Sequence, residues 1–122
     1  QAAYAGALVG QANNTTISGC KVTENSSVSA LYCAGGLVGY AIGSKISECE
    51  NHAAVTATHD SEGYAGGIVG FIQVITIKKC INYSSSIEGF YSGFMVGYAL
   101  GTPTLENNKD ESGSGLGEVG YW

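Results

Sequence analysis

The chain has 122 residues, of which 19 are glycine, one is proline and none is arginine. Ten acidic residues against five lysines give a formal net charge of −5. Binding to nucleic acid or to an anionic membrane surface needs clustered cations, so we expect neither kind of partner. No apolar run approaches the roughly 18–20 residues of a membrane-spanning segment, so we expect no membrane insertion.

A glycine-rich heptapeptide organises the sequence because it occurs four times. The copies cover residues 4–10, 33–39, 64–70 and 91–97, and their closing glycines lie 29, 31 and 27 residues apart. A period of this length indicates a repeat architecture. Since the chain begins inside a repeat, we expect it to be a mature or excised part of a longer protein.

Two further segments follow each heptapeptide. The second segment carries the pattern I-x-x-C, with its cysteines at Cys20, Cys49 and Cys80, and in the fourth unit Leu105 and Asn108 take these places. The third segment is less regular and lies around residues 22–28, 53–58 and 87. Val, Ile, Thr and Tyr favour strands, and the intervening Gly, Ser, Asn and Asp favour turns. No sustained helical period is present.

Three short strands per unit of about 29 residues predict an all-β fold, a parallel β-solenoid (β-helix) of about four coils. A small β-sandwich or barrel is the alternative, but such a fold needs no residue-by-residue identity between units. We expect a four-coil array over residues 1–108, divided into 1–30, 31–60, 61–88 and 89–108. Residues 109–122 then form a Gly/Ser-rich loop and a degenerate fifth copy of the repeat strand.

Equivalent residues of a parallel stack lie above one another, so the repeats predict columns of structural residues. Glycine marks positions where the backbone bends or packs too closely for a Cβ atom. The cysteine column should form a ladder of small buried side chains. The predicted columns are Gly6, Gly35, Gly66 and Gly93; Gly10, Gly39, Gly70 and Gly97; Val9, Val38, Val69 and Val96; and Cys20, Cys49 and Cys80.

A column of Leu8, Leu37, Ile68 and Met95 stands directly before the valine column. Adjacent residues of a strand point to opposite faces, so two neighbouring apolar columns need an explanation. Either a bulge turns both columns inward, or the strand is apolar on its outer face as well. We expect the second arrangement, with one column covered by another layer or another protomer. The next column, Gln11, Tyr40, Phe71 and Tyr98, is mostly aromatic.

The glycine core at residues 35–39 (G-G-L-V-G) and 66–70 (G-G-I-V-G), followed by I-x-x-C, resembles the GLUG repeat, named for its Gly-Leu-any-Gly pattern. The other two copies depart from it at Ala7, Phe94 and Met95. The resemblance implies a repeat scaffold of large extracellular or cell-surface proteins such as adhesins. It implies no catalytic residue.

The sequence contains few residues in patterns that are typical of metal sites or disulfides. Cys33 lies outside the cysteine column, and a disulfide from Cys33 to Cys20 or Cys49 is an alternative in an oxidising compartment. The two histidines, His52 and His59, do not recur in the other repeats and are typical of solvated loop residues. The oxygen-rich loop at residues 106–111 lacks the spacing of known calcium sites. We therefore expect no metal site and no cofactor.

Four asparagines begin an N-x-S/T sequon, which is the acceptor sequence for N-glycosylation. A eukaryotic secretory origin would make them glycosylation sites, whereas otherwise they reflect the abundance of Asn, Ser and Thr at turns. The four are Asn13, Asn14, Asn25 and Asn82.

The carboxylates are scattered and no arginine is present, so we expect no enzyme, with a polysaccharide-active β-helix enzyme as a distant alternative. Strand edges at the ends of a solenoid can pair with another chain. We therefore expect a structural extracellular module that joins copies of itself head to tail into a fibre or surface appendage. The alternative is a monomeric adhesin repeat segment of a larger surface protein that binds a glycan or a host protein.

Overall fold

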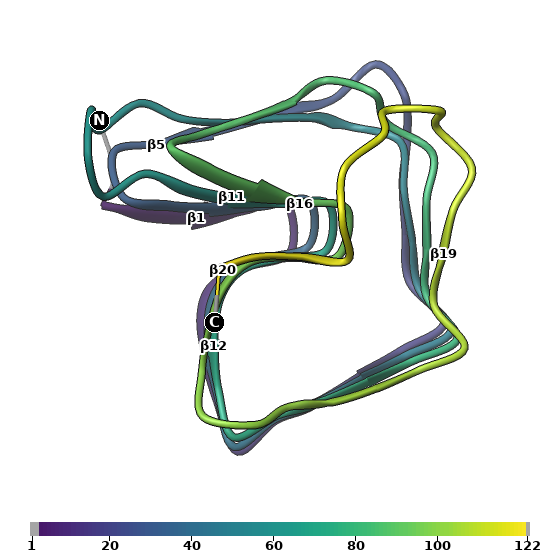
Figure 1. The fold of residues 1–122 in the computed structure, drawn as a ribbon. Helices are drawn as coiled ribbons and strands as arrows, with labels where there is room; N and C mark the ends of the chain where they lie inside the picture. Colours follow the sequence, from purple (N-terminus) through teal and green to yellow (C-terminus); the bar gives the residue numbers. More distant parts are fainter. Residues whose placement is uncertain (1–2, 122) are drawn as a thin grey trace.

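The computed structural model describes residues 3–121, and within this range every regular element is a β-strand. The strands pair in parallel, each with its equivalent about 29 residues away, and Figure 1 shows the coils nearly superposed along one axis. The predicted all-β parallel β-solenoid of about four coils is therefore confirmed. Since this part of the chain contains no helix, it has no helical segment able to span a membrane. Residues 1, 2 and 122 lie outside the described residues.

Each full coil contributes to five sheets, so the expected three strands per coil are wrong in number. Sheet A contains β1 (Tyr4–Gly6), β6 (Cys33–Gly35), β11 (Tyr64–Gly66) and β16 (Tyr91–Gly93). Sheet B contains β2 (Val9–Asn13), β7 (Val38–Ile42), β12 (Val69–Gln73), β17 (Val96–Leu100) and β20 (Val119–Tyr121). Sheet C contains β3 (Thr16–Ser18), β8 (Lys45–Ser47), β13 (Thr76–Lys78) and β18 (Thr104–Glu106). Sheet D contains β4 (Lys21–Val22), β9 (Glu50–Asn51), β14 (Ile81–Asn82) and β19 (Lys109–Asp110), and sheet E contains β5 (Ser27–Ala30), β10 (Ala54–Ala57) and β15 (Ile87–Glu88).

The additional strands arise because corners divide two of the three expected segments. The glycine heptapeptide bends between sheets A and B, and the I-x-x-C segment bends between sheets C and D. At the corner between C and D, one residue of each coil has the left-handed conformation, with φ from 53° to 66°. These residues are Gly19, Glu48, Lys79 and Asn107. A single left-handed residue turns the chain sharply, so a continuous apolar pattern can still break into two strands.

The corner between sheets A and B is concave, so the outer faces of the two sheets face each other across a notch (Figure 1). The glycine columns make this close approach possible. A Cβ atom on Gly35 would overlap the carbonyl oxygen of Val38, and one on Gly39 would lie 2.6 Å from the backbone nitrogen of Ala5. Real Cβ atoms do not approach other atoms that closely, so any side chain would force the two sheets apart.

The bend also turns the Leu and Val columns to the same side, which corrects the expectation that one of them needs an external cover. Leu37 lies in the bend itself and Val38 begins β7, and both side chains are fully buried in one core. Ile68 and Val69 are buried in the same way. Because a residue in a bend does not follow the alternation of a strand, two adjacent residues can both point inward.

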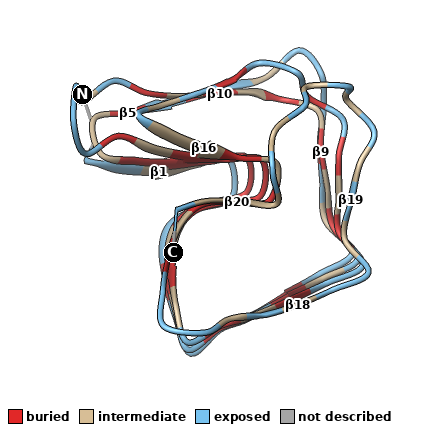
Figure 2. Cartoon of the chain, viewed as in Figure 1, coloured by how far each residue is buried: buried red, intermediate tan, exposed pale blue. Residues whose placement is uncertain are grey.

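The interior is divided into two hydrophobic clusters. Figure 2 shows buried residues both in the body of the solenoid and in the arm that projects from it. The larger cluster fills the body bounded by sheets B, C and D, and includes the isoleucine column of Ile46 and Ile77. The smaller cluster lies in the arm between sheets E and A, where most of its members are alanine or valine. Small side chains allow these two sheets to pack closely, which makes the arm thin.

A ladder of polar side chains runs from coil to coil along sheet D. Asn51 and Asn82 are both fully buried, and each accepts a hydrogen bond from the backbone N–H two residues later and donates one to the backbone carbonyl of that residue. The second N–H of each amide extends to the next coil, from Asn51 to Asn82 Oδ1 (3.4 Å) and from Asn82 to Asp110 Oδ1 (3.1 Å). Every amide group is therefore used, as burial of a polar group requires.

Asp110 ends this ladder and anchors the last turn of the chain. Its Oδ1 accepts hydrogen bonds from the backbone and side chain of Ser112, and its Oδ2 accepts one from Ser114 (3.0 Å). Burial by itself would raise the pKa of this carboxyl. The hydrogen bonds from Ser112, Asn82 and Ser114 outweigh burial, so the pKa of Asp110 lies below its ordinary value.

The glycine corner provides a matched pair of substitutions. In Gly70→Ala, the new Cβ would lie 2.7 Å from the backbone nitrogen of Ala34, whereas in Gly10→Ala, in the end coil, the nearest atom is 3.5 Å away. We expect Gly70→Ala to lower the free energy of unfolding by about 1–3 kcal/mol and Gly10→Ala to leave it nearly unchanged. Urea unfolding followed by circular dichroism measures both. Equal effects in the two variants would contradict the role of the corner.

Asp110 makes a pH-dependent contribution to stability. Its folded-state pKa is below the value of about 3.9 for an unfolded chain, so ionised Asp110 stabilises the fold fully above the unfolded-state pKa. This contribution is lost as the pH falls through the folded-state pKa. We expect Asp110→Asn to be less stable than the wild type at pH 7, and the difference to shrink as the pH falls below about 4. Urea unfolding at a series of pH values tests this, and a difference that does not change with pH would contradict it.

Candidate functional site: an aromatic face in the concave corner

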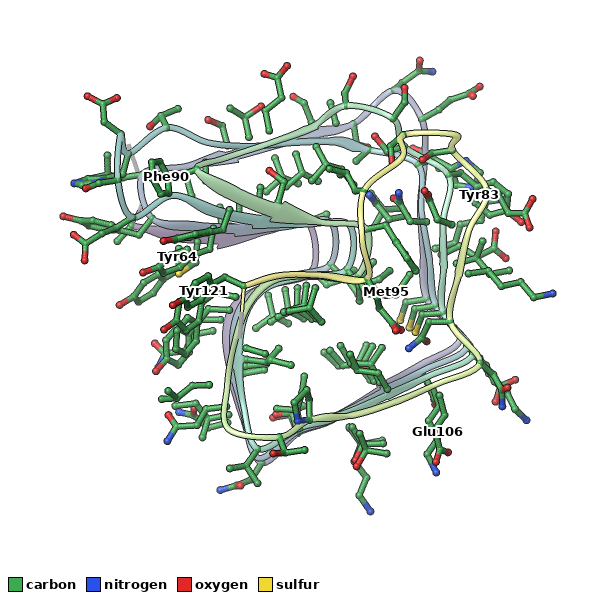
Figure 3. All side chains as sticks on the ribbon, viewed as in Figure 1. Tyr64, Tyr83, Phe90, Met95, Glu106 and Tyr121 are labelled. Carbon is green, nitrogen blue, oxygen red and sulfur yellow. The ribbon has the colours of Figure 1, made fainter. Side chains whose placement is uncertain are left out.

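Seven aromatic side chains line the notch between sheets A and B, and we call them the aromatic face. They come from the two outward-facing columns that flank the glycine corner, and Figure 3 shows Tyr64 and Tyr121 on this side of the solenoid. Sheet A contributes Tyr4, Tyr64 and Tyr91, and sheet B contributes Tyr40, Phe71, Tyr98 and Tyr121. The close approach of the sheets brings the two columns into contact, for example Tyr4 with Tyr40 at 5.2 Å between ring centroids.

Rings of the aromatic face stack on one another along the solenoid axis. In sheet B, Phe71 lies between Tyr40 (4.8 Å, 9° between planes) and Tyr98 (5.3 Å, 8°). In sheet A, Tyr64 stacks on Tyr91 (5.8 Å, 27°). These distances follow the spacing of paired strands, so the backbone register sets the ring spacing. Neighbouring rings of sheet B therefore face one another, whereas the sheet A rings are inclined by 37° to 68° to the sheet B rings beside them.

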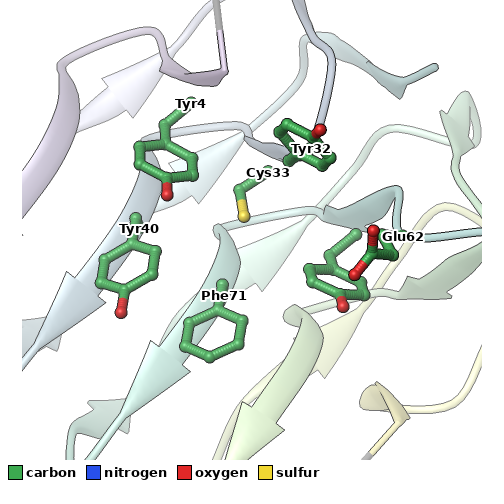
Figure 4. Close-up of a pocket in the computed structure, with 7 residues that line it drawn as sticks. Tyr4, Tyr32, Cys33, Tyr40, Glu62 and Phe71 are labelled. Atoms are coloured by element: carbon green, nitrogen blue, oxygen red, sulfur yellow. The ribbon is translucent and has the colours of Figure 1, made fainter. Parts of the chain in front are cut away.

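The stack in sheet A is interrupted at Cys33. This residue pairs with Tyr4 on one side and with Tyr64 on the other, so a thiol stands where the neighbouring coils carry a phenol ring. A pocket of about 390 Å³ opens at this position, and Figure 4 shows the residues that line it. We call it the Cys33 slot, and its lining residues are Tyr4, Tyr32, Cys33, Tyr40, Glu62, Tyr64 and Phe71.

The Cys33 slot combines aromatic walls with polar groups. Glu62 is exposed at the slot, and Tyr32 is held against the ring of His59 by stacking at 4.9 Å. Cys33 itself is 3% exposed, and burial raises the pKa of its thiol to about 12. The thiol is therefore uncharged at neutral pH and is a poor nucleophile. The slot offers shape and hydrogen-bonding groups rather than reactive ones.

The predicted cysteine column forms in the core, with Cys49 and Cys80 fully buried. Each thiol of the column lies 3.2–3.5 Å from the backbone carbonyl two residues earlier. Hydrogen bonding with Cys49 and burial raise the pKa of Cys80. All four cysteines are free thiols, and Cys33 faces the slot rather than this column, so the alternative of a disulfide from Cys33 is not observed.

The sequons differ in accessibility. Asn13, Asn14 and Asn25 are exposed, so glycosylation at these positions stays a prediction. Asn82 is fully buried, and its amide belongs to the polar ladder. A glycan at Asn82 is incompatible with this fold, so the prediction for that position is wrong.

The candidate ligands for metals have other contacts. His52 stacks on Tyr83 at 4.3 Å and lies 3.5 Å from Glu50, while His59 stacks on Tyr32. In the loop considered for calcium, Asp110 ends the polar ladder as described above. Within residues 3–121, no group of three or more His, Cys, Asp or Glu side chains is placed to hold a metal ion.

Two features of the structure, the polar ladder and the Cys33 slot, are not predicted by the sequence analysis above. The polar ladder has a recognisable signal, because Asn51 and Asn82 each stand two residues after a column cysteine, and Asp110 stands two residues after the Asn108 that replaces one. The Cys33 slot has a weaker signal, which is one small residue in a column of tyrosines. Its formation also depends on the contact between sheets A and B, which the sequence does not show.

The family model of the GLUG motif matches residues 30–56. This segment runs from the end of β5 through β6, β7, β8 and β9 into β10, which amounts to one complete coil. Comparison with curated proteins and with solved structures gave no match. The coils on both sides of the matched segment pair with it in register, glycine against glycine, at Gly6, Gly35 and Gly66. Residues 30–56 therefore carry the GLUG motif, and the coils on either side repeat its glycine positions in register.

Proposed function

We propose that this chain is a non-enzymatic, extracellular structural module that extends end to end by stacking the first coil of one copy on the last coil of another. The GLUG motif is found in extracellular surface proteins, and this supports an extracellular or cell-surface location. The buried thiol of Cys33 and the scattered carboxylates offer no catalytic cluster, which supports a structural role. The proposal rests on the residues and strand edges that are exposed at the two ends of the stack.

The first coil exposes residues whose equivalents form the core elsewhere. Leu8 is 47% exposed, whereas Leu37, Ile68 and Met95 of the same column are completely buried. The strands of this coil are terminal in all five sheets, so no strand among residues 3–121 lies beside the outer backbone groups of β1 to β5. An open strand edge next to an exposed core residue favours pairing with another strand.

The opposite end of the stack presents matching residues. β20 pairs with β17 through Val119 with Val96 and Tyr121 with Tyr98, which continues the valine and aromatic columns by one further step. A second copy stacked here in the same register would place its Val9 over Val119 and its Gln11 over Tyr121. The contact would bury Leu8 and extend sheet B across the junction. Because its two surfaces differ, the contact does not close on itself and produces filaments.

Leu8→Asp tests this contact. Burying a carboxylate at the junction without a partner is costly, so we expect this variant to remain monomeric while the wild type forms elongated particles. Sedimentation velocity over a range of concentrations and negative-stain imaging measure the difference.

Val74→Asp is the matched control because Val74 is also strongly exposed but lies in the third coil, away from both ends. Its φ of 53° is also one that Asp tolerates better than Val. We expect this variant to assemble like the wild type. A wild-type chain that stays monomeric at high concentration, or a Leu8→Asp variant that assembles equally well, would contradict the proposal.

A further inference from the structure

We propose that the Cys33 slot binds one pyranose residue of a carbohydrate in the gluco configuration, held between the rings of Tyr4 and Tyr64. The inference does not depend on end-to-end assembly, because every lining residue belongs to one copy of the chain and lies on the side of the solenoid. It rests on the width of the slot, the direction of its ring faces and the polar groups at its rim.

The slot has the width of one tyrosine ring, because Cys33 stands where the neighbouring coils carry a tyrosine. Tyr4 and Tyr64 stand two coils apart, with Cys33 between them. Two steps of the strand spacing separate their rings by roughly 10 Å. A ring placed midway lies about 5 Å from each wall. This distance leaves room on both sides for the axial hydrogens of a puckered pyranose ring.

The ring faces point into the gap. Tyr64 stacks one face on Tyr91, so its other face is directed toward the level of Cys33. Tyr4 is inclined by 37° to Tyr40, and Tyr64 is inclined by 38° to Phe71, while Tyr40 and Phe71 are nearly parallel. The two walls therefore have similar inclinations to the sheet B stack, whereas Tyr91, the next member of the column, is inclined by 68° to Tyr98. Phe71 and Tyr40 close the side of the slot toward sheet B.

The chemistry of the walls selects the configuration of the sugar. The face of an aromatic ring is electron-rich and attracts weakly positive C–H groups. In a pyranose whose ring substituents are all equatorial, such as β-glucose, every axial group on both faces is a C–H. An axial hydroxyl, as at C4 of galactose, would place a polar group against one of the two walls. A slot with two aromatic walls therefore favours the gluco over the galacto configuration.

Polar side chains at the rim of the slot can form hydrogen bonds with the equatorial hydroxyl groups of the sugar. Glu62 accepts hydrogen bonds, and the phenol groups of Tyr32, Tyr40 and Tyr64 can donate or accept them. Burial raises the pKa of Tyr40 and Tyr64, so both phenols keep their protons at neutral pH. The carboxylate of Glu62 and the net charge of −5 disfavour anionic sugars. The expected ligand is thus a neutral β-linked glucan or a neutral sugar of the same configuration.

Titration calorimetry with cellotetraose tests the proposal, using the full chain at a concentration where sedimentation shows a monomer. We expect saturable binding of cellotetraose and at least about tenfold weaker binding of the corresponding β-1,4-linked galactose tetramer. Equal affinity for the two sugars, or no binding of cellotetraose, would overturn the proposal. Saturable binding of a tyrosine-containing tripeptide in place of cellotetraose would also overturn it, since the slot would then accept an aromatic side chain.

Cys33→Tyr provides the most direct variant because it fills the slot with the residue that three other coils carry at this position. We expect it to fold and to bind cellotetraose at least about tenfold more weakly than the wild type. Tyr4→Ala should weaken binding in the same way by removing one wall. Tyr121→Ala is its matched control, since Tyr121 is similarly exposed (48% against 40%) but lies outside the slot. Undiminished binding by Cys33→Tyr, or equal losses in Tyr4→Ala and Tyr121→Ala, would contradict the proposed site.

Discussion

The architecture depends on the close approach of two strands at the concave corner between sheets A and B. Backbone atoms come so near at Gly35 and Gly39 that only a residue without a Cβ atom fits, and the contact at Gly35 recurs at Gly6, Gly66 and Gly93. The bend directs two successive apolar residues into one core. It also turns the outer faces of the two sheets toward each other. The glycine motif thus determines both the interior and the aromatic face.

Because equivalent residues of successive coils contact one another, the residue in one coil restricts which residues can occupy the same position in the next coil. A buried asparagine is acceptable in the core because Asn51 and Asn82 pair with each other and with Asp110, so no amide is left unsatisfied. Tyrosine and phenylalanine rings stack on the outside for the same geometric reason. Stability therefore depends on whole columns, and a substitution in one coil also affects the coils that stack on either side of it.

The two proposed binding surfaces are places where a column is interrupted. At the end of the stack the interruption is the absence of a further coil, which leaves Leu8 exposed among columns that are buried elsewhere. At Cys33 the interruption is one small residue among tyrosines, and it opens a slot on the side of the stack. Both surfaces follow from the regularity of the surrounding columns, because a gap in a regular array has a defined size and shape.

The sequence by itself determined the all-β class, the solenoid, the repeat of about 29 residues and the membership of the glycine, valine and cysteine columns. Periodic identity is a local property, so residues such as Gly39 and Gly70 can be aligned without coordinates. The direction of each corner was decided only in three dimensions, because one left-handed residue or one concave bend changes the face to which a side chain points. For this reason the Leu and Val columns share one core, five sheets replace three, and Asn82 is buried in a ladder rather than exposed at a turn. The Cys33 slot likewise exists only because the tertiary fold brings sheets A and B together around the missing ring.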